Sequence, residues 1–354
     1  MKRLLLLGGG YGNMRIMHKL LPNTLPKDYE IILVDEKPFH GLKTEYYALA
    51  AGTKSDKEVR MSFPEHERLS YVYGEVSNID LDKQLVTVGE NQVDYDILVI
   101  GLGSEDKFHN VPGAKEYSYT IQRMNNARRT LKMTAELPAG STVGVVGAGL
   151  SGIEIASELR ESRKDINIKL FDRGERILPD FPARLSKYVE RWFIENNVEV
   201  IPHSNITKVD QNKLYNNEEA IKVDASIWTA GIQPVEVVRS LDIEKAKSGR
   251  IKVNQYHQIP TDEKVYIVGD CADLPFPPTA QTAELQAEQI VDVFKYTWAD
   301  KELPGTMPSL KVQGMIGSLG SKEGFAYIKE TTVTGRIARI LKSGVLWMYK
   351  LNAK

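Results

Sequence analysis

The sequence predicts an α/β fold with two Rossmann-like units, β meanders beside them and a mixed α/β segment at the C-terminal end. The order strand, glycine-rich turn, helix and acid-ended strand occurs twice, within residues 2–36 and 141–172. A further apolar strand at residues 264–270 ends in Gly-Asp. The length of 354 residues agrees with about two domains.

The first glycine-rich turn follows the apolar run at residues 2–7. Its residues are Gly8, Gly9, Gly10, Tyr11 and Gly12. The first glycine permits a tight bend, and the next lets a pyrophosphate approach the backbone. Asn13 stands where the pattern G-x-G-x-x-G has a third glycine, so we expect a slightly displaced helix and weaker cofactor binding. Asp35 and Glu36 end the next strand and are placed to bind an adenosine ribose.

The second turn matches the full pattern and opens a helix. Its glycines are Gly147, Gly149 and Gly152. The N-terminus of the helix offers free N–H groups to a phosphate. Asp172 ends the following strand and favours NADH over NADPH, because a carboxylate repels a 2′-phosphate. Arg173 and Arg176 would reduce that repulsion, or they are ordinary surface cations.

A β meander and a late strand complete the pattern. Residues 71–96 alternate between apolar and polar, which indicates an antiparallel meander. Together with the two turns, the late Gly-Asp predicts FAD in the first unit and a nicotinamide cofactor in the second. Asp270 is then placed to bind the ribityl chain of FAD; the alternative for Asp270 is a turn or helix-capping acid.

Composition excludes several classes of protein. The formal net charge of −1 gives no reason to expect a nucleic-acid partner. No apolar run is long enough to span a membrane, and the four leucines after Arg3 are too few for a signal peptide, so we expect a cytoplasmic protein. Cys271 is the single cysteine, which excludes an internal disulfide and dithiol chemistry. No metal site is expected.

Further motifs follow in a specific order. They are YYALAAG, YDILVIGLGS, VVGAGLSGIEIASEL, FDRGERILPDF, IWTAGIQP, YIVGDCAD, PPTAQTAELQAEQI and GSLGSKEG. This ordered set resembles the type II NADH dehydrogenases over nearly the whole chain. That family implies a glutathione-reductase-like two-domain fold, FAD and NADH as cofactors, and a quinone as electron acceptor.

The resemblance implies roles for individual residues. Val76 would pack on the adenine of FAD, while Ala280 and Gln281 would place backbone N–H groups at the flavin ring. Glu154 would lie near the nicotinamide and take part in the redox and proton steps; the alternative is a first-turn helix acid. The residues thereby assigned to FAD are Gly8, Gly9, Gly10, Tyr11, Gly12, Asp35, Glu36, Val76, Asp270, Ala280, Gln281 and Lys350. Those assigned to NADH are Gly147, Gly149, Gly152, Glu154 and Asp172.

Two further departures from the family concern the acceptor and the membrane. Leu285 stands where the family has a second glutamine beside the quinone channel, so only Gln281 offers a hydrogen bond there. The sequence stops where the family continues with an amphipathic helical tail. The residues that give the tail a basic and apolar surface are Arg336, Ile337, Arg339, Ile340, Leu341, Lys342, Leu346, Trp347 and Lys350. This surface predicts weak contact with anionic lipid, or else a solvated rim of a β region.

These observations predict a divergent member of the family and leave more than one electron acceptor to consider. We expect an FAD-binding domain at 1–110 and 255–305, an NADH-binding domain at 111–254, and a C-terminal segment at 306–354 whose residues from 309 onward form strands. The first hypothesis is NADH:quinone oxidoreductase. A soluble acceptor and a poorly active FAD- and NADH-binding regulatory protein are the alternatives. The family also suggests a homodimer.

Overall fold

A six-stranded sheet forms one half of the protein, for which the computed structural model describes residues 1–21 and 23–352. The strand order is β21-β22-β9-β1-β2-β5, and all neighbours are parallel except β21 and β22. The strands are β1 (Lys2–Leu7), β2 (Tyr29–Asp35), β5 (Leu69–Tyr73), β9 (Ile97–Ile100), β21 (Gln258–Ile259) and β22 (Asp262–Ile267). Leu4 to Leu7 are fully buried, because both faces of the sheet are covered.

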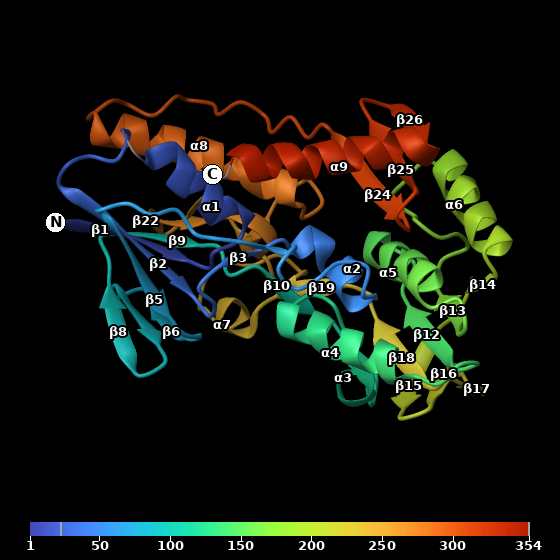
Figure 1. Ribbon diagram of the computed structural model, residues 1–354. Helices are drawn as coiled ribbons and strands as arrows, with labels where there is room; N and C mark the ends of the chain where they lie inside the picture. Colours follow the sequence, from blue (N-terminus) through green and yellow to red (C-terminus); the bar gives the residue numbers. More distant parts are fainter. Residues whose placement is uncertain (22, 353–354) are drawn as a thin grey trace.

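Helices α1 (Tyr11–Leu20) and α8 (Ala280–Trp298) cover one face of this sheet (Figure 1). The meander β6 (Val76–Asp80), β7 (Leu85–Val88) and β8 (Asn91–Asp94) packs on the other face. The expected meander was therefore too long at its start. Residues 69–73 instead form the parallel edge strand β5, because β5 pairs with β2 along its whole length and buries Leu69.

A second sheet of five parallel strands forms the other half, in the order β11-β18-β12-β13-β14. Its strands are β11 (Ser118–Tyr119), β12 (Thr142–Val146), β13 (Asn167–Phe171), β14 (Val198–Ile201) and β18 (Ala225–Trp228). The helices around it are α3 (Ala114–Tyr117), α4 (Met124–Glu136), α5 (Leu150–Ser162) and α6 (Ala183–Glu195). Its own meander is β15 (Ile206–Asp210), β16 (Lys213–Asn216) and β17 (Glu219–Lys222).

Shorter elements lie beside and between the two sheets. They are β3 (His40–Gly41), η1 (Lys43–Glu45), α2 (Tyr46–Ala50), β4 (Arg60–Met61), β10 (Ser104–Asp106), β19 (Ile232–Pro234), α7 (Glu236–Arg239), β20 (Ile251–Lys252), η2 (Gly269–Cys271) and β23 (Ala272–Asp273). The helix α2 contacts both α4 and α5, and β10, which follows β9, pairs with β19, which follows β18. Segments that follow strands of the first half therefore contact the second half.

The C-terminal segment is a three-stranded antiparallel sheet followed by a helix. These elements are β24 (Gly314–Leu319), β25 (Glu323–Ile328), β26 (Thr331–Thr334) and α9 (Gly335–Asn352). The strands were predicted, but the tail is helical where strands were expected. The reason is a helical repeat: Ala338 and Lys342 are buried four residues apart, while the positions between them are largely exposed.

Helix α9 runs from the β24–β26 sheet along the molecule toward α1 (Figure 1). It therefore spans the distance between the two large sheets. No helix within residues 1–21 and 23–352 is long and apolar enough to cross a membrane.

Candidate functional site

The two glycine turns have the same construction. Gly8 and Gly147 have φ angles of +88° and +101°. A Cβ at Gly8 would lie 2.5 Å from the carbonyl oxygen of Gly101, and one at Gly147 would lie 2.8 Å from the Cα of Ala230. Both positions therefore require glycine, which lets each turn press against the connection that follows a neighbouring strand.

The outer side of each turn is open. A Cβ at Gly149 would meet nothing within 4 Å among the described residues, and one at Gly10 would approach only the oxygen of Gly101, at 3.8 Å. The two glycines are the N-caps of α5 and α1, and the first N–H groups of a helix have no acceptor within it. This open, N–H-lined side fits a pyrophosphate in both turns.

The acid at the end of each second strand binds back to its turn. Asp35 Oδ2 accepts a hydrogen bond of 2.6 Å from Gly9 N, and Asp172 Oδ2 accepts one of 2.7 Å from Ala148 N. Gly9 and Ala148 occupy the same place in the two turns. Burial raises the pKa of Asp35, although the bond from Gly9 opposes that rise. Each acid therefore lies next to the predicted phosphate site of its own turn.

Asn13, which stands in place of the third glycine, forms hydrogen bonds across the first turn. Its side-chain Nδ2 donates to the carbonyl oxygens of Leu7 and Gly8, at 2.9 and 2.8 Å. Gly101 leaves the space for this amide, since a Cβ there would lie 2.7 Å from Nδ2. The amide therefore ties α1 to the end of β1, and this connection replaces the close backbone contact that a third glycine would make.

Glu36 and Val76 flank the same end of the first sheet. Glu36 is exposed and lies 3.6 Å from Nη1 of Arg123. Val76 is buried at the start of β6, two residues after Gly74, whose N–H donates to the backbone oxygen of Asp35. The structure thus brings Asp35 and Val76 together, while the Glu36 carboxylate points to a cation on the other half of the chain.

Asp270 lies in η2, directly after β22, and two groups that the sequence did not single out bind it. Its Oδ2 accepts hydrogen bonds from the Ser104 hydroxyl at 2.6 Å and from Lys43 Nζ at 3.2 Å. Burial alone would raise the pKa of Asp270, but Lys43 and Ser104 outweigh it and hold the pKa below its usual value. Asp270 is therefore a stable anion, able to accept from the hydroxyls of a ribityl chain.

Gln286 of α8 also supports this turn. Its Oε1 accepts from Gly269 N at 2.9 Å, whereas its Nε2 is buried with no hydrogen-bond partner among the described residues. A buried N–H₂ group without a partner costs free energy unless something accepts from it. This unpaired donor beside Asp270 is a second feature that fits a bound polar cofactor.

The N-terminal turn of α8 carries the remaining predicted contacts. Thr279 caps the helix by accepting from Thr282 N, which leaves the first N–H groups free at Ala280 and Gln281. The Gln281 side chain accepts from Gln313 N at 2.9 Å, so it also holds the segment that leads to β24. Leu285 is partly buried one turn further along and offers no hydrogen bond.

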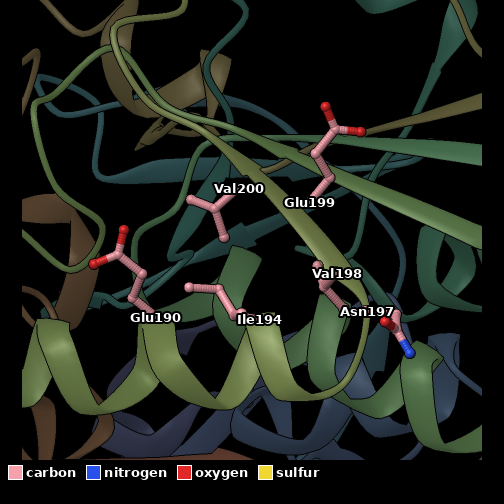
Figure 2. A pocket seen from close by; sticks show the side chains of 6 residues that line it. All are labelled: Glu190, Ile194, Asn197, Val198, Glu199 and Val200. Atoms are coloured by element: carbon pink, nitrogen blue, oxygen red, sulfur yellow. The ribbon is translucent and has the colours of Figure 1, made fainter.

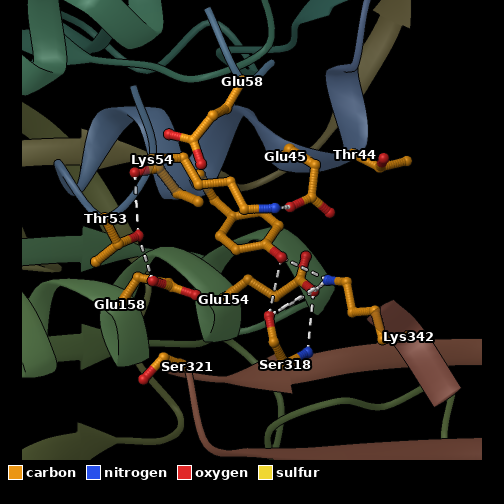
Figure 3. Close-up of polar contacts among 12 residues, drawn as sticks. Thr44, Glu45, Thr53, Lys54, Glu58, Glu154, Glu158, Ser318, Ser321 and Lys342 are labelled. Atoms are coloured by element: carbon orange, nitrogen blue, oxygen red, sulfur yellow. Dashed lines mark hydrogen bonds and ion pairs between the residues drawn. The ribbon is translucent and has the colours of Figure 1, made fainter. Parts of the chain in front are cut away.

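Glu154 lies at a buried junction of four elements (Figure 3). Lys342 of α9 donates to its Oε1, and Ser318 of β24 donates to the same atom through its backbone N–H at 3.1 Å and its hydroxyl at 3.2 Å. Tyr47 of α2 accepts from Lys342 Nζ at 2.6 Å and lies 3.0 Å from the Ser318 hydroxyl. We call Tyr47, Glu154, Ser318 and Lys342 the Glu154 cluster.

The electrostatics of the Glu154 cluster are those of a buried ion pair. Burial raises the pKa of Glu154, while Lys342 opposes the rise. Burial also disfavours the charge of Lys342, but Glu154, Tyr47 and Glu45 outweigh it and hold the pKa of Lys342 above its usual value. Burial raises the pKa of the Tyr47 hydroxyl. A proton can therefore be kept within this cluster away from solvent.

Two further buried carboxylates surround the cluster (Figure 3). Glu45 pairs with Lys54, and Glu158 accepts from the Thr53 hydroxyl. Burial raises the pKa of Glu158, although the hydrogen bond from the Thr53 hydroxyl opposes that rise. Three acids thus meet between α2 and α5, and two of them have a lysine.

Two lysines of the C-terminal tail lie elsewhere than expected. Lys342 was expected on a basic surface, yet it is buried against Glu154. Lys350, predicted at the flavin, donates to the backbone oxygen of Glu58 at 3.1 Å. Tyr47 and Ser318 belong to the motifs YYALAAG and GSLGSKEG, but nothing in those motifs assigned them to Glu154. Only the fold brings the four residues together.

A shallow hollow lies on the outer edge of the second sheet, away from these residues (Figure 2). It is lined by Glu190, Ile194, Asn197, Val198, Glu199 and Val200. Its two carboxylates come from α6 and β14, and that of Glu199 pairs with Lys169 at 2.9 Å. Within residues 1–21 and 23–352, no group of three or more His, Cys, Asp or Glu side chains is arranged to hold a metal ion.

Comparison with known proteins identifies the family. Residues 2–287 match the family described as pyridine nucleotide-disulphide oxidoreductase. The NADH dehydrogenase-like protein YutJ of Bacillus subtilis is 55% identical, with 99% of each chain covered. The type II NADH:quinone oxidoreductase of Staphylococcus haemolyticus is 24% identical, with 96% of this chain and 93% of that protein covered.

Solved structures share the fold. NDH2 from Plasmodium falciparum in complex with NADH superposes with a TM-score of 0.85 at 16% identity, covering 99% of this chain and 96% of that chain. The sulfide:quinone oxidoreductase from Aquifex aeolicus gives a TM-score of 0.84 at 20% identity, covering 99% and 92%. The predicted α/β fold and the prediction of FAD and NADH as cofactors are confirmed at the level of the family. The chain therefore belongs to the pyridine nucleotide-disulphide oxidoreductase family and is an NADH dehydrogenase-like oxidoreductase.

Proposed function

We propose that the chain takes hydride from NADH through FAD and passes two electrons to a quinone. The observation that carries this proposal is the buried Glu154 cluster, which stands at the start of the helix behind the second glycine turn. We assign FAD to residues 1–110 and 255–305 and NADH to residues 111–254. Quinone as acceptor is supported by the relative from S. haemolyticus and by the shared fold.

The residues of the chain would bind and orient the two cofactors. The first turn with Asp35 would hold the adenosine and pyrophosphate of FAD, and Asp270 would hold its ribityl chain. The second turn with Asp172 would hold NADH. FAD, when bound, supplies the hydride-accepting and electron-transferring chemistry. The N-terminus of α8 offers a partial positive charge where negative charge develops.

The Glu154 cluster would hold a proton that the reduction of the quinone requires. Reduction of a quinone to a quinol consumes two electrons and two protons, and a hydride brings one of those protons. The second must come from the protein or the solvent. Glu154 and Tyr47 are the titratable oxygens of a cluster closed off from water, and Lys342 lies between them as a permanent cation. We propose that Glu154 and Tyr47 hold this second proton.

A soluble electron acceptor is the second candidate, because of the residues where the family binds its quinone. Leu285 removes one of the two glutamines expected beside a quinone carbonyl, and Glu284 adds a carboxylate whose pKa burial raises. Gln281 is already bonded to the backbone of Gln313. This side of α8, which has a carboxylate and lacks the second glutamine, is the observation that favours a soluble acceptor.

We also propose that α9 touches the inner face of the cell membrane. Its outward side carries apolar side chains at helical spacing: Ile337, Ile340, Leu341, Val345, Trp347, Met348 and Leu351, all exposed. Arg336 flanks them in water. A helix lying in the lipid interface has this arrangement of an apolar side with cations beside it. The homodimer suggested by the family stays a prediction, to be decided by the mass of the protein in solution.

An anaerobic experiment tests the proposed reaction. The purified yellow protein is mixed with excess NADH, flavin bleaching is followed, and menadione is then added. We expect bleaching followed by rapid recolouring. Bleaching without recolouring by the quinone would favour a soluble acceptor, and no bleaching would overturn both enzyme proposals.

A further inference from the structure

The last turns of α9 lie against the first glycine turn. The hydroxyl of Tyr349 is 2.9 Å from Nε2 of His40, and Nδ1 of the same ring is 2.7 Å from the backbone oxygen of Gly9. His40 is fully buried. One side chain thus connects the C-terminal helix to the backbone that faces the predicted pyrophosphate.

The direction of both hydrogen bonds is fixed by chemistry. A carbonyl oxygen can only accept, so Nδ1 of His40 carries the proton and donates to Gly9. Burial lowers the pKa of His40 to about 4, so the ring is neutral near pH 7. Nε2 then offers a lone pair, and the Tyr349 hydroxyl donates to it.

Aromatic contacts hold the same three groups together. The Tyr11 and His40 rings are 4.9 Å apart in an edge-to-face arrangement, and the Tyr11 and Tyr349 rings are 5.0 Å apart. Tyr11 is the first residue of α1, so this packing involves the helix whose N-terminus faces the phosphates. Both the turn and the helix that follows it are therefore in contact with Tyr349.

The hydrogen bonds from Tyr349 through His40 to Gly9 orient the peptide between Gly9 and Gly10. In a trans peptide the C=O of Gly9 and the N–H of Gly10 point in opposite directions within one rigid plane. Because His40 holds the carbonyl on the buried side, the N–H of Gly10 is turned toward the open side of the turn. That is the side on which a pyrophosphate would bind.

We propose that Tyr349 and His40 are positioning residues for FAD, and that through them α9 controls how long FAD stays bound. The inference rests on FAD occupying the first unit. It concerns retention of the cofactor and is independent of which acceptor takes the electrons.

The test measures FAD release from the purified holoprotein by the rise in free-FAD fluorescence after dilution, without NADH or acceptor. We expect Tyr349→Phe to release FAD about tenfold faster, because the donor to His40 is lost while the ring stays in place. Tyr296→Phe is the matched control, since Tyr296 is an exposed tyrosine on α8. We expect its release rate to equal that of the parent, and an unchanged rate for Tyr349→Phe overturns the proposal.

A double variant tests whether Tyr349 acts through His40. His40→Phe keeps a buried ring but removes both bonds, so adding Tyr349→Phe should not accelerate release further. If the two effects multiply instead, the Tyr349 hydroxyl acts independently of His40 and the proposal is wrong. If His40→Phe does not fold, the comparison of Tyr349→Phe with its control decides. A parent protein that retains FAD but does not oxidise NADH overturns the proposed reaction alone, whereas a parent without FAD overturns both.

Discussion

The ammonium of Lys342 binds the carboxylate of Glu154 across 188 residues of sequence, and both groups are buried. This pair joins the C-terminal helix to the helix behind the second glycine turn. Removing the lysine would leave a buried carboxylate without its cation, which is far more costly than removing the whole pair.

Lys342→Met should therefore lower the free energy of unfolding by about 3 kcal/mol, as measured by urea denaturation at pH 7. The double variant Glu154→Gln with Lys342→Met should recover most of that loss, because no unpaired charge remains. Arg336→Met, on the exposed side of α9, should change stability by less than about 0.5 kcal/mol. Equal stability of the single and double variants would contradict the pairing.

Asn13→Asp should destabilise the protein more than Asn13→Ala. The aspartate has the same size but no donor, and it would face the carbonyl oxygens of Leu7 and Gly8. We expect a loss of about 2 kcal/mol for Asn13→Asp in urea denaturation, together with weaker FAD retention. Stability equal to that of the parent would show that the two bonds contribute nothing.

Leu285→Gln should speed electron transfer to a quinone. The new amide would be able to bind a quinone carbonyl from the same side of α8 as Gln281. In anaerobic stopped flow we expect recolouring by menadione to be severalfold faster and bleaching by NADH to be unchanged. Leu285→Met is the control, because it keeps an apolar side chain of similar volume. Identical recolouring in all three proteins would refute the channel argument.

His40 predicts a pH dependence of stability with a definite sign. The folded protein keeps the ring neutral down to its lowered pKa of about 4, whereas an unfolded histidine takes up a proton near pH 6.5. As the pH falls through this window, the unfolded state binds more protons, so the free energy of unfolding falls.

Between pH 7 and 5 the parent should therefore lose about 2 kcal/mol more than His40→Asn in urea denaturation. His18, which lies near enough to lower the pKa of His40 further, is present in both proteins and cancels in the comparison. Parallel pH profiles would show that His40 is not responsible.

Trp347→Ser should weaken binding to lipid vesicles. Trp347 is one of the largest exposed side chains on the outer side of α9, and its burial in a bilayer interface is favourable. In flotation with vesicles of 30% phosphatidylglycerol in phosphatidylcholine, we expect at least a tenfold loss of binding. Ser343→Ala, an exposed position on the same helix, should bind as the parent does. Neutral vesicles should bind all three proteins more weakly.

The sequence was sufficient to predict the parts of the fold that local patterns encode. Both glycine turns, their helices and the acid-ended strands follow from residues close together in the chain, so their periodicity reveals them. The strand β5 was assigned to the wrong sheet because alternation of side chains does not distinguish a parallel edge strand from a meander strand.

The Glu154 cluster was beyond such patterns. A lysine in an amphipathic tail is normally solvated, and only the fold brings Lys342 to a buried acid. The same holds for Lys43 and Ser104 at Asp270, and for Gln286 behind it. These residues lie in different elements, and no spacing in the sequence connects them. Asn13 is a similar case: its side-chain amide fits at the first turn because Gly101, in the connection after β9, leaves the space for it.

The order of strands in the first sheet has a consequence for biosynthesis. β22 inserts beside β9, although the whole second sheet is encoded between them. A nascent chain on the ribosome therefore has β9 as an unpaired edge until residues 262–267 have emerged. Such long-range pairing is slow and leaves an open edge exposed to aggregation. We expect the second half to fold first during translation, and the first to close around its late strand only afterwards.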